Sequence, residues 1–67
     1  MSLAKVIEVI AEGKTMEEAV ENAVKQASKT VHNIKSVYVE NINAVVEGEK
    51  ITTYRINAKV TFILEQN

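Results

Sequence analysis

The feature that most constrains the fold is a strict alternation of apolar and polar residues near the C-terminus. Residues 53–62 read TYRINAKVTF, in which every second side chain is apolar. Because successive side chains of a strand point to opposite faces, this segment predicts a strand with one apolar and one polar face. The apolar face needs a covering layer. The polar face carries Arg55, Asn57 and Lys59, and its environment is the first question that the sequence raises.

An amphipathic helix is the predicted covering layer. Residues 15–18, TMEE, match a capping box, in which the Thr15 hydroxyl accepts from the N–H of Glu18 and the Glu18 carboxylate accepts from the N–H of Thr15. Apolar residues then recur at spacings of three and four, which predicts a helix over residues 16–32. Its inner stripe is mostly alanine and valine, so a curved sheet can approach it closely.

Two long strands are predicted on either side of a hairpin loop. Residues 36–47 and 50–64 flank Gly48, which can take the positive φ that such a loop requires. The apolar positions of the first strand change parity along its length. A single face can collect them only if the strand slips by one residue, which predicts a β-bulge near Asn41.

The remaining strand completes the predicted fold. Residues 5–11, KVIEVIA, are rich in β-branched residues and apolar on both faces, so both faces need cover. The element order is β-α-β-β. It predicts a single α+β domain over residues 1–67, with a three-stranded antiparallel sheet wrapped around one helix. Ser36, Tyr38 and Arg55 are then expected on the sheet face that points away from the helix.

Size and composition restrict how such a domain is stabilised. A chain of 67 residues buries only about 60% of the surface that its unfolded form exposes. The sequence has no cysteine and a single histidine, His32, so disulfides and a zinc site are not expected and oligomerisation is the remaining remedy. His32 has no nucleophile or carboxylate partner by spacing, which argues against an enzyme.

Charge and hydropathy exclude further classes of protein. A net charge of −1 and only three aromatic residues argue against nucleic-acid binding. No apolar run approaches the length of about 20 residues that spans a bilayer, and the N-terminus does not resemble a signal peptide. A soluble, cytoplasmic protein with no membrane partner is therefore expected.

Three segments in this order and spacing resemble the dodecin family: KVIEVI near the start, ASKTVHNI at the end of the helix, and TYRINAKVTFIL at the close. The resemblance runs almost from end to end. It implies a hollow homododecamer of β-α-β-β subunits that binds flavins, riboflavin or FMN, near two-fold axes. Such a protein stores or sequesters the flavin and is not a catalyst.

The resemblance also implies a ligand site with two departures. The family's stacking tryptophan corresponds to Ser36, and its hydrogen-bonding glutamine corresponds to Arg55. Serine offers no aromatic plane, and a guanidinium donates hydrogen bonds but cannot accept one. Tyr38, two residues after Ser36 on the same predicted face, can supply some stacking. The predicted flavin-binding residues are therefore Ser36, Tyr38, Arg55 and Asn57.

An alternative is a dodecin-like shell that does not bind flavin and is structural or binds another ligand, such as calcium. Calcium requires about six to eight oxygen ligands. The loop acids Glu47 and Glu49, or symmetry-related copies of Glu40 with Asn41 and Asn43, could meet at an axis. No residue of this sequence is assigned as a metal ligand or as a catalytic group.

Overall fold

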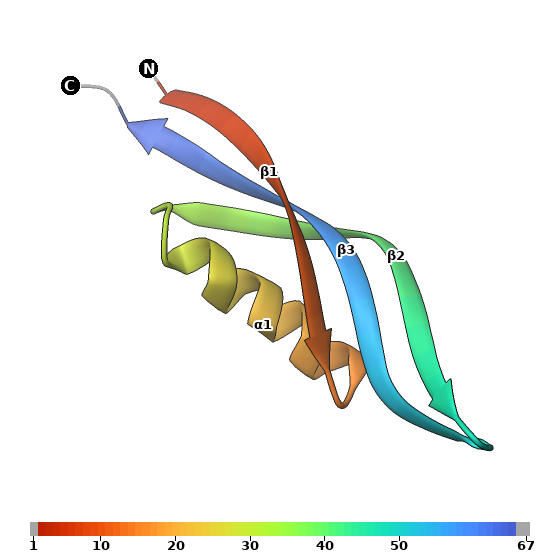
Figure 1. Ribbon diagram of the computed structural model, residues 1–67. Coiled ribbons are helices and arrows are strands. Elements are labelled where there is room, and N and C mark those ends of the chain that lie inside the picture. Colours follow the sequence, from red (N-terminus) through yellow and green to blue (C-terminus); the bar gives the residue numbers. More distant parts are fainter. Residues whose placement is uncertain (1, 66–67) are drawn as a thin grey trace.

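The computed structural model describes residues 2–65 and confirms the predicted β-α-β-β order (Figure 1). Its elements are β1 (Ser2–Gly13), α1 (Met16–Ser28), β2 (Ile34–Glu47) and β3 (Lys50–Glu65). The strands form one antiparallel sheet in the order β1-β3-β2, so the last strand lies in the middle. Helix α1 lies against one face of this curved sheet, which confirms the α+β fold class (Figure 1).

Helix α1 begins as predicted and ends four residues earlier than predicted. The Thr15 Oγ1 accepts from the Glu18 N–H at 3.0 Å. The Glu18 carboxylate, however, accepts from the N–H of Lys14 at 3.0 Å, which is one residue further back than the predicted donor, Thr15. At the other end the chain must turn toward β2. It does so through Asn33, whose φ of 63° is left-handed.

The predicted bulge in β2 is confirmed. The register with β3 shifts between Val39 and Asn41, so that Glu40 is the extra residue. Val39 pairs with Ala58 before the shift, and Ile42 pairs with Ile56 after it. The bulge therefore keeps the apolar residues of β2 on the helix side along most of the strand. Two further shifts, near residues 35 and 46, were not predicted.

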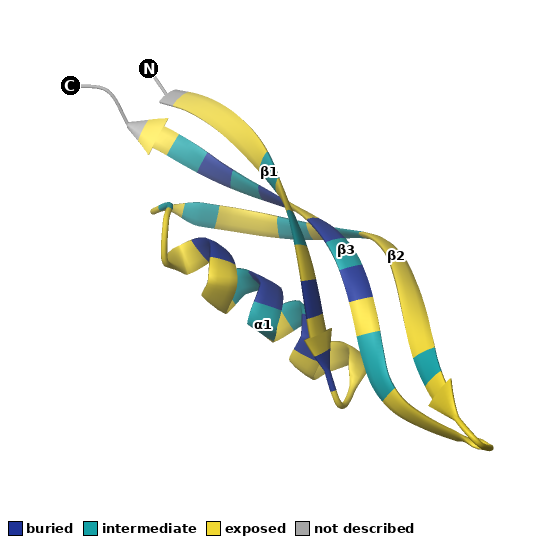
Figure 2. Cartoon of the chain, viewed as in Figure 1, coloured by how far each residue is buried: buried dark blue, intermediate teal, exposed yellow. Residues whose placement is uncertain are grey.

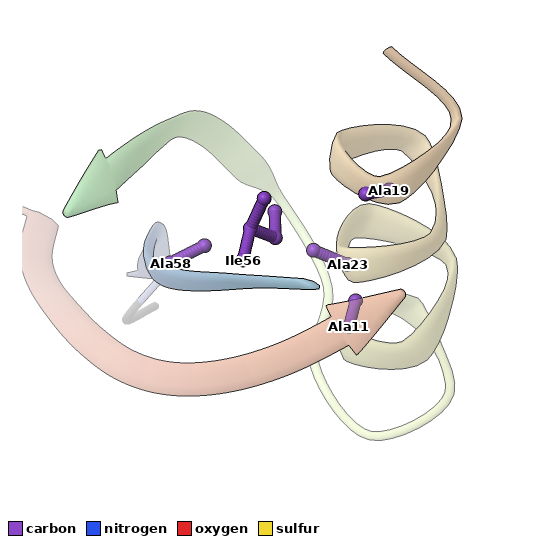
Figure 3. Close-up of a cluster of buried hydrophobic side chains, with 5 residues drawn as sticks. All are labelled: Ala11, Ala19, Ala23, Ile56 and Ala58. Carbon is purple, nitrogen blue, oxygen red and sulfur yellow. The ribbon is translucent and has the colours of Figure 1, made fainter. Parts of the chain in front are cut away.

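The core lies between the helix and the central strand. Alanines of α1 pack against Ala11 of β1 and against Ile56 and Ala58 of β3 (Figure 3). The buried positions of β3 alternate along the strand, as Figure 2 shows, which confirms the apolar face predicted from TYRINAKVTF. The helix approaches β1 so closely that a Cβ added at Gly13 would lie 2.5 Å from the backbone nitrogen of Ala19.

The far half of the β2–β3 hairpin extends beyond the helix, and no other element within residues 2–65 covers it (Figure 1). The described part of the molecule measures 54 × 18 × 14 Å. Ile42, Val46 and Ile51 on this arm are each about half exposed, at 45%, 58% and 52%. A two-stranded ribbon is only marginally stable in water by itself, so we expect this arm to be covered from outside the chain.

Within residues 2–65, α1 is too short and too polar to cross a membrane. The expected cytoplasmic location stays a prediction.

Candidate functional site

The polar residues of the central strand lie on the sheet face away from the helix, as predicted. Ile56, Ala58 and Val60 of β3 are buried toward α1, so the alternating residues between them point outward. The register brings Tyr38 of β2 opposite Lys59, and Glu8 of β1 lies opposite Lys59 on its other side. We call this surface of the sheet, centred on Asn57 and Lys59, the outer face.

A lysine with two acidic neighbours occupies the middle of the outer face. The Lys59 ammonium lies 3.1 Å from a carboxylate oxygen of Glu40, the bulge residue. The hydrogen bond and charge of Glu40, with a smaller contribution from Glu8, raise the pKa of Lys59 above its usual range. Tyr38 lies beside it with 65% of its surface exposed. The middle of the outer face therefore presents one cation and one exposed aromatic ring side by side.

Arg55 is held at the β1 side of the outer face by Glu12. The Arg55 Nε donates to the Glu12 Oε2 at 2.8 Å, and its Nη2 lies 2.7 Å from the same oxygen. The two residues are also direct partners in the β1–β3 register. Both side chains are about half exposed, so the pair contributes little to stability but fixes the direction of the guanidinium. That direction is toward β1 and away from Ser36 on β2.

The four predicted flavin-binding residues share the outer face but do not form one site within a chain. Ser36 pairs with Thr61, which lies six residues along β3 from Arg55. Six residues of a strand span about 20 Å, which is too far for one flavin ring system to touch both. Tyr38 and Asn57 are diagonal neighbours and are about 7–8 Å apart. A site that used Ser36 and Arg55 together would need more than one copy of the chain.

A groove of 810 Å³ lies between α1 and the edge of β1, and the sequence did not predict it. Its lining residues are Ile10, Ala11, Glu12, Asn22, Lys25, Gln26, Lys29 and Arg55. The helical members follow the spacing i, i+3, i+4 and i+7, which is a polar stripe that could have been recognised in the sequence. Asn22 joins the two walls, because its side-chain amide donates to the Glu12 carbonyl oxygen at 2.7 Å.

Metal-ligating side chains do not cluster in the part of the chain that the structure describes. Within residues 2–65, no three histidine or acidic side chains come close enough together to hold a metal ion. Glu40, one of the acids considered for calcium, is paired with Lys59. A calcium site would therefore have to be assembled from several copies of the chain.

Comparison with known proteins identifies the family. The dodecin family model matches residues 3–65. A crystal structure of a protein from Thermus thermophilus superposes with a TM-score of 0.91 at 22% identity, and the match covers 100% of both chains. A tryptophan-to-phenylalanine variant of the Thermus thermophilus dodecin gives a TM-score of 0.89 at 22% identity, covering 98% of this chain and 100% of that one.

The dodecin of Streptomyces coelicolor is also similar. It is 25% identical, with a TM-score of 0.87 over 98% of this chain and 96% of that chain. None of the curated proteins matches this sequence. The family match covers nearly the whole described fold, and the solved structures share its architecture. The chain therefore belongs to the dodecin family.

Proposed function

We propose that this chain assembles as a homododecamer that binds flavin, riboflavin or FMN, and stores or sequesters it without catalysis. Dodecins are generally non-catalytic binding proteins. The observation that carries the proposal is the outer face itself. It presents Tyr38 with 65% of its surface exposed, beside the polar side chains of Asn57 and Lys59. No element of the described part of the chain covers this sheet surface (Figure 1).

The proposed pocket is built from more than one copy of the chain. Tyr38 supplies the aromatic plane, and Asn57 offers both a donor and an acceptor to the polar edge of the flavin ring. Ser36 and Arg55 are too far apart in one chain to act on the same ring. A two-fold axis would bring the Ser36 of one copy and the Arg55 of another to a shared pocket.

The pocket is expected to bind flavin more weakly than one with a tryptophan at position 36. An aromatic stack on a ligand contributes on the order of 1–3 kcal/mol, and Ser36 supplies none of it. Arg55 donates to carbonyl oxygens but cannot accept from a ring N–H. Tyr38 is then the main remaining source of stacking.

A riboflavin titration followed by flavin fluorescence tests the proposal, because stacking on an aromatic ring quenches the emission. We expect saturable quenching by the purified protein. Tyr38→Leu removes the ring and is expected to abolish most of the quenching, whereas the matched variant Tyr38→Phe keeps the ring and most of the effect. No quenching at high micromolar protein would contradict the proposal.

The second candidate is a dodecin shell that does not bind flavin and is structural or binds metal ions such as calcium. The observation in its favour is Ser36, since the stacking residue of the family is missing. Elemental analysis of the purified protein separates the two candidates. Bound calcium at a fixed ratio to the chain, together with no quenching of riboflavin, would favour the second.

A further inference from the structure

The groove between α1 and the edge of β1 has an excess of positive charge. Arg55 lines it but is already paired with Glu12, the acid among the lining residues. Within residues 3–64 the ion pairs join Arg55 to Glu12 and Lys59 to Glu40, so the ammonium groups of Lys25 and Lys29 are left without a carboxylate. Both lysine side chains border the same concave surface.

We propose that this groove binds a small phosphorylated molecule, with Lys25 and Lys29 holding the phosphate group. Residues four apart on a helix lie about 5–6 Å apart at their Cβ atoms, so two flexible ammonium groups can converge on one phosphate. Lysine is a common phosphate ligand in proteins. The volume of 810 Å³ falls within the range of about 300–1,000 Å³ that is typical of small-molecule sites.

The other lining residues suit the rest of such a ligand. Ile10, which is 66% exposed, and Ala11 form an apolar part of the wall. Gln26 adds a side-chain amide to the helical wall, about one turn before Lys29. Asn22 fixes the helix to β1 through its bond to the Glu12 carbonyl, so the groove is held open by the fold itself. A ligand with one phosphate and a compact apolar body matches this combination.

This inference does not rest on the proposed flavin site, although Arg55 belongs to both surfaces. Riboflavin carries no phosphate, and pyrophosphate carries no ring, so the two probes report on the two surfaces separately. The variant Lys25→Gln/Lys29→Gln removes both charges from the groove. The control Lys35→Gln/Lys50→Gln removes the same charge from exposed positions on β2 and β3 that do not line it.

The test is isothermal titration of the assembled protein with pyrophosphate and with phenyl phosphate at low ionic strength, where surface charges are least screened. We expect saturable binding that the groove variant weakens at least about tenfold, the effect of losing one hydrogen bond to a charged group. The control variant should stay within about twofold of the wild type, and quenching of riboflavin should be unchanged in both variants.

Three results would overturn the inference. One is that neither pyrophosphate nor phenyl phosphate shows saturable binding. Another is an equal loss of affinity in the groove and control variants, since that would show a general charge effect. The last is that the dicarboxylate succinate binds as tightly as pyrophosphate and phenyl phosphate do, since the groove would then recognise negative charge alone.

Discussion

Ser36 points to the same sheet face as Tyr38 and Lys59, but its side chain is only a short hydroxymethyl group. This short side chain affects the proposed binding of flavin and leaves the fold unaffected. Ser36 is exposed and makes no contribution to the core, so a larger side chain there meets open surface within one chain. Position 36 is therefore a place where the affinity of the proposed flavin site can change without a change in fold.

We expect Ser36→Trp to tighten riboflavin binding at least about tenfold, because one indole stack contributes on the order of 1–3 kcal/mol. The measurement is the fluorescence titration described above. Ser36→Leu adds apolar surface without an aromatic plane and should give only a small gain. Equal gains for both variants would show that the residue acts through general hydrophobic contact.

Arg55 is the other departure that the resemblance to dodecins implies. Its effect on stability can be tested separately from its effect on the proposed flavin binding. Arg55→Gln removes the pair with Glu12, in which both side chains are about half exposed. We therefore expect the free energy of unfolding, measured by thermal unfolding, to fall by less than about 1 kcal/mol. Glutamine can both donate and accept, so riboflavin binding should become tighter. Weaker binding in this variant would mean that the guanidinium itself contacts the flavin.

At the scale of elements, the two glycines of the chain have different roles, and the sequence indicated only one of them. Gly48 has a φ of 66° in the hairpin loop, as its position between two strands predicted. Gly13 is the last residue of β1, three residues before α1 begins. In the structure its missing Cβ lets α1 pack against the end of β1, at 2.5 Å and 2.9 Å from backbone atoms of Ala19 and Glu18.

Gly13→Ala should therefore destabilise the protein more than Gly48→Ala. The alanine methyl at position 13 meets helix backbone, which must move away, at a cost of about 1–3 kcal/mol. At position 48 no described residue other than the chain neighbours lies within 4 Å of an added Cβ, and the cost is the left-handed conformation alone, about 1 kcal/mol. Thermal unfolding of both variants checks the order. Equal shifts would contradict the close approach of helix and strand.

The sequence predicted those features of the fold that depend on the residue pattern within one strand or helix. The parity change in β2 was enough to predict the bulge near Asn41, and the alternation in β3 predicted which side chains point outward. The end of the helix was wrong because Val31 and Ile34 continue the apolar spacing after the chain has turned. The groove was missed because it forms where the polar stripe of α1 meets the edge of β1, a contact that neither segment encodes alone.

At the scale of the whole molecule, one chain leaves too much surface in water. It exposes 5069 Å², whereas a compact monomer of 7.4 kDa exposes about 4,200 Å². The core is thin: among the described residues, Ile56 and Val60 are the largest side chains that are fully buried, and most of the others are alanines. The exposed apolar residues include Val6 on the outer face, together with those of the uncovered arm.

The arm gives the sharpest test of how this surface is covered. We expect the wild-type protein to have a mass near twelve times 7.4 kDa by sedimentation, as the family resemblance implies.

Val46 is 58% exposed within one chain, so a lysine there is tolerated if the chain stays alone and is costly if a second copy covers it. Val46→Lys should therefore shift the mass toward smaller species or lower the unfolding temperature. The neighbouring variant Glu47→Lys, at an exposed polar position near the hairpin tip, should do neither. A folded 7.4 kDa monomer of the wild type in dilute buffer would show that the arm needs no cover, and a flavin pocket shared between copies could not exist.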